Sequence, residues 1–142
     1  MLLVKTQVDK SPIHGLGLFA AEPIAKGTPI WRFTPGLDLD LDTSVLDVQP
    51  AAFRKRLLHY GYIDPRLNRY ILCCDDARFI NHSDKPNIQS DFSLDRYGID
   101  AAARDIETGE ELTIDYESVE GFRPNQSLQR TLSSQHRAGQ RC

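Results

Sequence analysis

The pattern of apolar and polar positions predicts many short strands with one helix among them. Short apolar or alternating stretches are separated by Pro, Gly, Asp and Ser turn signals as far as Tyr116. The expected strands cover 2–8, 18–21, 28–33, 70–73, 77–80, 87–92, 98–103 and 110–116, with 37–42 as an edge strand or extended loop. The fold class is therefore mostly β with few short helices.

One stretch has helical spacing, and the predicted helix covers 48–60. Pro50 suits the first turn of a helix, where its missing N–H costs nothing. Apolar side chains then recur at helical intervals from Phe53 to Tyr60, and Gly61 provides the stop signal.

Two stretches carry the candidate chemistry. The first is R-F-I-N-H-S-D-K-P-N at 78–87, where an apolar run gives way to polar residues and Pro86 ends any helix. This stretch predicts a loop of defined conformation at the end of a strand. The second is E-E-L-T-I-D-Y at 110–116, which alternates like a strand after the turn signal at Gly109.

These two stretches resemble signature motifs of the SET-domain protein-lysine methyltransferases, R-F-I/V-N-H-S-C-x-P-N and E-L-T-x-D-Y. The stretch H-G-L-G-L-F-A at 14–20 is similar to the family's glycine motif, G-x-G-L-F-A. The resemblance spans 3–116, and three motifs in the family's order are far more specific than any one alone. It implies several small sheets around a knot-like core, in which the C-terminal segment passes through a loop, a rare exception to unknotted connections.

The resemblance also implies an activity, the transfer of a methyl group from S-adenosylmethionine to a lysine of a protein substrate, leaving S-adenosylhomocysteine. Tyr116 matches the family's catalytic tyrosine, although an isolated tyrosine is more often a core residue. Asn81 and His82 match a cofactor-holding pair, and Gly15 and Gly17 let the backbone approach the cofactor. The cofactor-binding set implied is His14, Gly15, Leu16, Gly17, Arg78, Phe79, Asn81, His82 and Tyr116.

The resemblance further implies a channel for the substrate lysine. Phe33 stands in place of an early family tyrosine, unless the comparison slips by one residue. Tyr62 and Tyr70 are either core residues or channel liners, and the sequence does not choose between them. Ile114 occupies a position that is often Phe or Tyr in the family and is linked to the number of methyl groups added. Because this residue differs, the sequence does not predict that number. Phe122 is expected to help close the channel if the channel does not stay open.

The chain of 142 residues suits one domain, expected over 1–120, followed by a tail over 121–142. The tail is rich in Gln, Ser and Arg and has hardly a large apolar side chain. Such a segment buries too little surface to order itself. We expect it to stay mobile until a ligand binds, or to close the lysine channel.

The net charge and the hydropathy of the chain limit the classes of partner that we expect. A net charge of −3 without a Lys/Arg stripe argues against direct nucleic-acid binding and favours a basic, lysine-presenting protein or peptide. The chain lacks both a secretory signal and an apolar run of membrane-spanning length, so we expect an intracellular, soluble protein, cytoplasmic or nuclear, with no membrane partner. The oligomeric state is open, and a dimer is possible.

No metal is expected. The family's zinc-ligating cysteine in N-H-S-C is Asp84 here, and the only cysteine in the tail is Cys142. The stretch 38–49 begins like a calcium loop but lacks its glycine and its final glutamate. Cys73 and Cys74 lie in or beside an apolar run, and all three cysteines are expected to be reduced.

Two rival hypotheses stay open. One is a non-catalytic SET-like module that binds cofactor or peptide, suggested by Phe33, Ile114 and the missing zinc ligands. Cofactor binding without methyl transfer would favour it. The other is an unrelated small β protein with chance motifs, which a failure to bind S-adenosylmethionine would favour.

Overall fold

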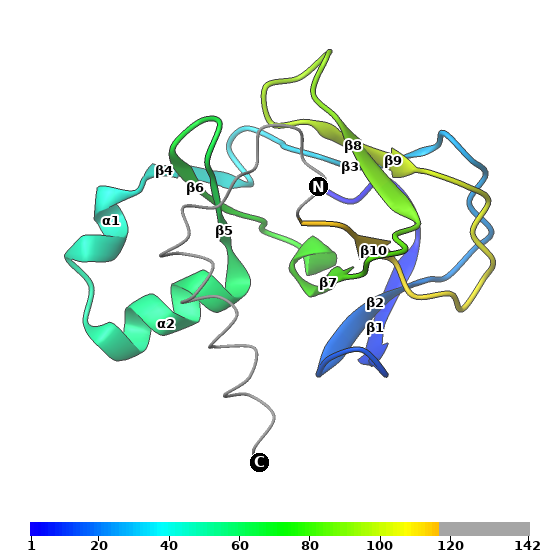
Figure 1. The fold of residues 1–142 in the computed structure, drawn as a ribbon, viewed down its shortest axis with the longest axis horizontal. Coiled ribbons are helices and arrows are strands. Elements are labelled where there is room, and N and C mark those ends of the chain that lie inside the picture. The colour runs from blue at the N-terminus through cyan, green and yellow to red at the C-terminus, as the bar shows by residue number, and fades with distance from the viewer. Residues whose placement is uncertain (117–142) are drawn as a thin grey trace.

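The computed structural model describes residues 1–116, in which strands predominate and helices are short (Figure 1). The described strands are β1 (Thr6–Lys10), β2 (Leu16–Ala20), β3 (Pro29–Arg32), β4 (Leu39–Asp42), β5 (Tyr62–Asp64), β6 (Arg69–Leu72), β7 (Asn81–His82), β8 (Ile88–Asp91), β9 (Ile99–Ala102) and β10 (Thr113–Ile114). The described helices are α1 (Ser44–Asp47), α2 (Ala51–Tyr60) and the 3-10 helix η1 (Asp76–Phe79). The mostly β fold class is confirmed. The predicted tail with Phe122, the predicted boundary at residue 120 and Cys142 lie outside the described residues.

The described strands form three small sheets. β1 pairs with β2, the order β4-β6-β5 makes a second sheet, and the order β3-β9-β8-β10-β7 makes the third. β10 is parallel to both of its neighbours, so that Ile114 lies between His82 and Ile88. The neighbours β7 and β8 are joined directly by residues 83–87. A late strand is thus inserted between two earlier strands that follow each other directly in the chain.

The side chain of Asn87 fastens this insertion. Asn87 is 2% exposed. Its Oδ1 accepts a hydrogen bond from the Thr113 amide at 2.8 Å, and its Nδ2 donates to the Glu111 carbonyl at 2.8 Å. Only a side chain that both donates and accepts satisfies these two backbone groups at once. Asn87 therefore ties the loop before β8 to the segment that enters β10.

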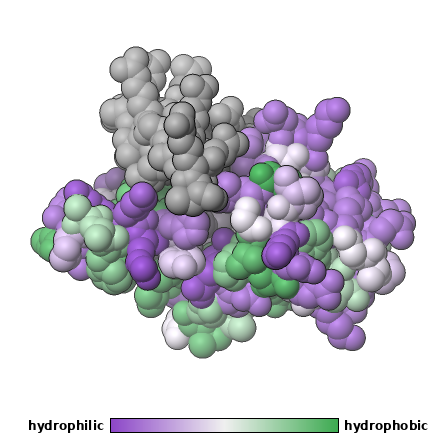
Figure 2. Space-filling view, turned by 90° about the horizontal axis from the view of Figure 1, so that it is seen from below, coloured by the Kyte–Doolittle hydropathy of each residue, from purple (hydrophilic) through white to green (hydrophobic). Residues whose placement is uncertain are grey.

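The core lies where β2, β3, β6 and β8 meet the loops around residues 106 and 112. Its most deeply buried aliphatic side chains are Leu18, Ile30, Ile71, Ile88, Ile106 and Leu112. Burying one such side chain contributes about 1.5–3 kcal/mol. By contrast, α2 has no buried residue. On the face drawn in Figure 2, apolar residues form separate patches among polar ones. No helix within residues 1–116 is long and apolar enough to span a membrane.

The helix differs from its prediction at the start. It was predicted over 48–60, but α2 begins at Ala51, with Pro50 outside it in an extended conformation. A residue that precedes proline avoids helical geometry, so the chain cannot run helically through this point. α1 is a separate turn before it, which the pattern did not predict. The predicted stop at Gly61 is confirmed, because α2 ends at Tyr60.

Two predicted strands are corrected by local hydrogen bonds. Residues 77–79 of the predicted strand 77–80 belong to η1 instead, because the Asp75 carboxylate accepts from the Ala77 amide at 3.1 Å and caps a helical turn. Of residues 110–116, only β10 is a strand. The residues before it bond to β2, where the Leu112 amide donates to the Leu18 carbonyl at 2.7 Å.

The remaining differences are at element ends. The first strand was predicted over 2–8 but is β1, which runs on to Lys10, while Leu2 makes only an isolated bridge to Trp31. β5 was not predicted, because three residues give too little periodicity. The predicted edge strand within 37–42 is confirmed as β4, which is outermost in its sheet. Cys73 and Cys74 are free thiols, as predicted.

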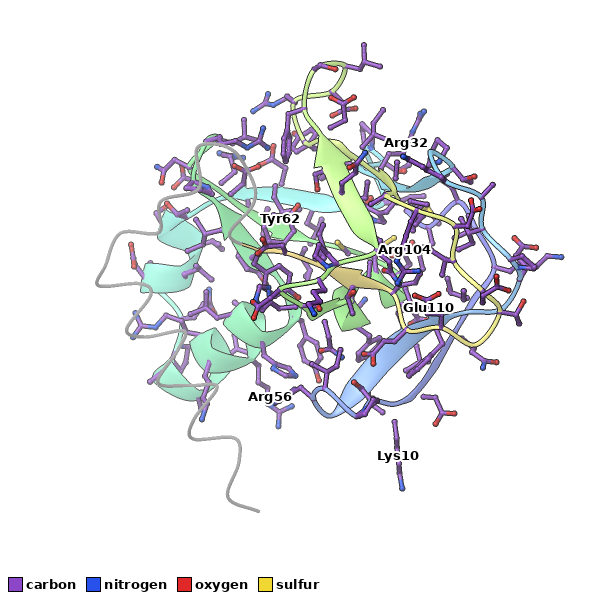
Figure 3. All side chains as sticks on the ribbon, turned by 45° about the vertical axis from the view of Figure 1, so that its right-hand side comes forward. Lys10, Arg32, Arg56, Tyr62, Arg104 and Glu110 are labelled. Atoms are coloured by element: carbon purple, nitrogen blue, oxygen red, sulfur yellow. The ribbon has the colours of Figure 1, made fainter. Side chains whose placement is uncertain are left out.

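Arg104 and Glu110 close the loop that leads into β10 (Figure 3). The Arg104 guanidinium donates to one Glu110 oxygen, and the Glu107 amide donates to the other at 3.1 Å. The hydrogen bond from Arg104 is the main reason that the pKa of Glu110 is lowered to about 2. The ionised carboxylate therefore helps to hold this loop.

Replacing Asn87 should test the fastening of β10. In Asn87→Ala the Thr113 amide and the Glu111 carbonyl lose their partner, and each unsatisfied buried group costs about 1–3 kcal/mol. We expect the free energy of unfolding, measured in urea, to fall by about 2–5 kcal/mol. The control Gln89→Ala, on an exposed position of β8, should change it by less than about 0.5 kcal/mol. Equal losses in the two variants would contradict this function of Asn87.

The Glu110 carboxylate predicts a dependence of stability on pH. Its folded pKa lies below the value of about 4.3 for an unfolded chain, so its stabilisation is complete above that value and is lost as the pH falls toward 2. We expect the wild-type free energy of unfolding to fall more steeply between about pH 4.5 and 2 than that of Glu110→Gln. Urea unfolding across this range measures both slopes, and parallel slopes would refute the prediction.

Candidate functional site

The side-chain amide of Asn81 joins the three sequence motifs. From β7, its Nδ2 lies 3.0 Å from the Leu16 carbonyl in the glycine motif. It also lies 2.8 Å from Glu111 Oε1, in the motif around β10. The same nitrogen is within 3.3 Å of the His14 carbonyl and 3.2 Å of Ser11 Oγ. Three segments that are far apart in sequence therefore converge on one amide.

Ser11 and Glu111 complete this junction. The Ser11 hydroxyl donates to Glu111 Oε1 at 2.8 Å and accepts from the Ile13 amide at 2.9 Å. The Ser11 amide donates to the Gly15 carbonyl at 2.9 Å, which closes the loop between β1 and β2. Neither residue was in the predicted site. Glu111 stood inside a recognised motif, whereas Ser11 gave only the signal of an ordinary Ser-Pro turn.

Glycine is required at the two positions of the loop for different physical reasons. Gly15 has φ +50°, a left-handed conformation that glycine adopts without strain. At Gly17 a Cβ would lie 2.8 Å from the carboxylate carbon of Glu111 and 3.0 Å from Ser11 Cβ. The space left by the missing side chain of Gly17 is therefore filled by Glu111.

Tyr116 is held against the N-H motif from two sides. Its hydroxyl donates to the Ile80 carbonyl at 2.5 Å, and its backbone amide donates to His82 Nδ1 at 3.2 Å. The two rings stack with centroids 5.4 Å apart. Because Nδ1 accepts, His82 carries its proton on Nε2, which lies 3.3 Å from Asp84 Oδ1. The Tyr116 hydroxyl thus contacts the residue that precedes Asn81.

Tyr62 and Tyr116 are partly exposed phenols with raised pKa values. Desolvation raises the pKa of Tyr116 to about 12 and that of Tyr62 well above its usual value, although 47% and 43% of these residues are exposed. The Cys73 thiol adds to the rise in both. Figure 3 shows Tyr62 near the middle of the molecule.

Of the other predicted channel residues within residues 1–116, Phe33 and Tyr70 are buried and Ile114 is partly buried. Phe33 is 7% exposed and stacks on Tyr97 with ring centroids 3.8 Å apart. Tyr70 is fully buried, and its hydroxyl donates to the Leu57 carbonyl at 2.6 Å. Ile114 packs against the core from β10. Their predicted contacts with a lysine stay predictions, and each side chain has a structural role in the core.

Arg78 and Phe79, both in the predicted cofactor set, belong to η1. The Arg78 guanidinium donates to the carbonyls of Asp75 and Cys74 at 3.0 Å each, so it fixes the turn before β7. Phe79 packs against the core. The structure thus brings together His14, Gly15, Leu16, Gly17, Asn81, His82 and Tyr116, and places Arg78 and Phe79 behind them as support. Within residues 1–116 there is no cluster of three or more His, Cys, Asp or Glu side chains that would hold a metal ion.

Comparison with known proteins decides the family. The model of the SET domain matches residues 15–117, which includes all three motifs. The chain belongs to the SET-domain family. A curated relative from Plasmodium falciparum, named "Putative histone-lysine N-methyltransferase 1", is 30% identical over 129 residues, which cover 80% of this chain. This SET domain corresponds to only 2% of that relative's length.

A solved structure supports the same assignment. The crystal structure of a putative histone methyltransferase from Plasmodium falciparum superimposes on this SET domain with a TM-score of 0.54 at 26% identity. The match covers 81% of this chain and 95% of that one. The several small sheets described above are therefore the SET fold, as the sequence motifs implied.

A double-mutant cycle should test why residue 17 is glycine. Gly17→Ala places a methyl group against the Glu111 carboxylate, and such overpacking costs about 1–3 kcal/mol. In a Glu111→Ala background the same substitution should cost less than half as much, because the obstructing carboxylate is gone. Urea unfolding of the four proteins measures the coupling. An unchanged cost in the second background would mean that Glu111 is not what requires glycine here.

Proposed function

We propose that this SET domain transfers a methyl group from S-adenosylmethionine to a lysine side chain of a protein substrate. The proposal is carried by one observation, the junction at Asn81. It brings the glycine loop and the N-H motif together with the segment that ends in Tyr116, a phenol whose pKa is raised by desolvation. The relatives' names support this class of reaction.

The junction has more hydrogen-bond acceptors than donors. An amide nitrogen carries two hydrogens, yet four oxygen atoms lie within 3.3 Å of Asn81 Nδ2. The carbonyls of His14 and Leu16 both face this nitrogen, and the carboxylate of Glu111 adds negative charge. This donor-poor site fits a cationic ligand with an ammonium group. We therefore place the methionine end of the cofactor at His14, Leu16 and Asn81.

When bound, S-adenosylmethionine supplies a methyl group on a positively charged sulfur. The remaining residues of the predicted set, Gly15, Gly17 and His82, surround the same junction, and Arg78 and Phe79 support it from η1. This assignment fits the loop carbonyls and the partly exposed ring of His82, which stacks on Tyr116.

Tyr116 would orient the substrate amine. Its hydroxyl hydrogen is donated to the Ile80 carbonyl, so the phenol oxygen presents lone pairs and accepts a hydrogen bond from the lysine nitrogen. The nitrogen's own lone pair then stays free to attack. The raised pKa of Tyr116, about 12, keeps the phenol neutral at physiological pH, so it aligns the amine without holding it as an ion pair.

The desolvated surroundings of Tyr116 would favour the reactive, neutral form of lysine. A free lysine has a pKa of about 10.4 and is charged at neutral pH. Desolvation disfavours the ammonium form, and the sulfonium charge disfavours it further. Alignment of nitrogen, methyl carbon and sulfur then supplies the rest, since orientation is worth about 7–11 kcal/mol at its best.

We propose a lysine-rich, basic protein as substrate, with histones as the first candidates because the relatives are named after them. The acidic edge strand β4, with Asp40 and Asp42, is compatible with a basic partner. Asp40 is also paired with Arg69 at 2.5 Å, so part of that charge is structural.

Replacement of one hydroxyl should test the catalytic role. Tyr116→Phe keeps the ring but removes the acceptor for the lysine nitrogen, and loss of alignment costs on the order of 100-fold in rate. We expect this loss in turnover with labelled cofactor and a core histone mixture, while calorimetric cofactor affinity stays within about twofold. Tyr60→Phe, on the exposed side of α2, is the matched control and should keep wild-type turnover.

Three results would decide between the hypotheses. Unchanged turnover in Tyr116→Phe would refute the catalytic assignment. Cofactor binding by the wild-type protein without transfer to any lysine-rich protein would favour the non-catalytic module. Absence of cofactor binding would refute the proposed junction site itself.

A further inference from the structure

The backbone amide of Tyr116 is held by a side chain and not by a strand. β10 ends at Ile114, where its pairing with His82 of β7 stops. Two residues further on, the Tyr116 amide donates to Nδ1 of the His82 ring at 3.2 Å. The same ring stacks on the Tyr116 phenol with centroids 5.4 Å apart. One imidazole therefore positions the backbone end of Tyr116, while the Ile80 carbonyl holds only its hydroxyl.

This hydrogen bond exists in only one protonation state of the ring. Nδ1 accepts from the Tyr116 amide only while it carries no hydrogen, so His82 must be neutral. In the imidazolium both ring nitrogens are donors, and two N–H groups would then face each other. Histidine changes its charge between about pH 5 and 8 more readily than other side chains. The side chain of His82 is 33% exposed, so solvent water can supply and remove the proton.

A second acceptor lies beside the same nitrogen. Asp115 Oδ1 is 3.7 Å from Nδ1, which is too far for a hydrogen bond but close enough for an ion pair. Asp84 Oδ1 is 3.3 Å from the other ring nitrogen, Nε2. Two carboxylates and the Tyr116 phenol thus face the ring. A proton added to Nδ1 would therefore be directed toward Asp115, the nearby carboxylate on that nitrogen.

Forming that bond requires a movement at Tyr116. A charge-assisted hydrogen bond has a length of about 2.7–2.9 Å, so the ring and residues 115–116 would shift relative to each other by about 1 Å. The shift also breaks the contact that holds the Tyr116 amide. A displacement of about 1 Å can lower the rate of an aligned reaction by about 100-fold. Acid should thus misalign the phenol without unfolding the domain.

We propose that His82 is a positioning residue whose neutral ring holds Tyr116 in line, and whose protonation transfers the Nδ1 contact from the Tyr116 amide to the Asp115 carboxylate. This inference rests on the proposed function, because it concerns the alignment of the substrate amine. The lysine must also lose a proton before it attacks, so it adds a pH dependence of its own. The two contributions can be separated, because only one of them depends on residue 82.

His82→Asn and His82→Leu separate the hydrogen bond from the ring. Asparagine offers Oδ1 near the position of Nδ1 and does not take up a proton, whereas leucine offers no acceptor. With saturating labelled cofactor and a saturating lysine peptide, we expect kcat at about pH 8 to be about tenfold lower in His82→Leu than in His82→Asn. The ratio of the wild-type kcat to that of His82→Asn should fall by about tenfold between about pH 8 and 5.5, because lysine protonation affects both proteins alike. Circular dichroism at each pH checks that the proteins stay folded.

A structural readout tests the exchange of partners without any turnover. In NMR, the amide nitrogen resonance of Tyr116 should shift with pH in step with the His82 imidazole in the wild-type protein. In His82→Asn it should stay constant over the same range. Asp115→Asn removes the charge that receives the new N–H donor and should weaken the acid loss of kcat. Asp84→Asn, the same change at the other ring nitrogen, is the matched control and should keep that loss.

The remaining outcomes count against the inference. A constant Tyr116 resonance in the wild-type protein would show that the imidazole does not hold this amide. Equal kcat in His82→Asn and His82→Leu would show that the acceptor does not position the phenol. Equal effects of Asp115→Asn and Asp84→Asn would reduce the switch to net charge at the ring. Absence of methyl transfer, with a Tyr116 resonance that still follows the imidazole, would refute the proposed function and not the contact.

Discussion

The fold depends on the buried amide of Asn87. Its oxygen accepts from the Thr113 amide and its nitrogen donates to the Glu111 carbonyl, so the loop between β7 and β8 is fastened to the segment that enters β10. These two bonds fix the register of β10, in which Thr113 lies beside Asn81. Once that register is set, Glu111 falls next to the amide of Asn81 and Tyr116 falls next to Ile80. The geometry of the candidate site is therefore a consequence of this register.

The residues of the same junction constrain one another through their size and charge. Glu111 occupies the space that Gly17 leaves, accepts from Ser11 and meets the amide of Asn81. A buried polar network of this kind is stable only when its members are satisfied together. Here the acceptors outnumber the donors, so a ligand that brings hydrogens and positive charge completes the network. The structural and the binding roles of these residues are thus two results of one arrangement.

The sequence predicted the family, the mostly β fold and the convergence of its motifs, because all three are recorded in local residue patterns. It did not predict η1, which a cap from Asp75 creates, nor the shortening of the last strand to β10, where β2 takes the preceding backbone groups. Nor did it identify Ser11, whose importance arises from a carboxylate 100 residues away. Local propensity describes a residue's neighbours in the chain, whereas these features depend on neighbours in space.

The ionisable groups Tyr62, Tyr116 and Cys73 indicate the surroundings that the proposed substrate lysine would meet. Burial penalises the charged form of every group, so it raises the pKa of an acid and lowers that of a base. Tyr62, Tyr116 and Cys73 all have raised pKa values with desolvation as the first cause. A lysine placed among them would be driven the opposite way, toward the neutral amine. The desolvation that keeps two phenols and a thiol protonated would therefore also favour the neutral amine, with the ammonium proton passing to solvent water before the nitrogen reaches Tyr116.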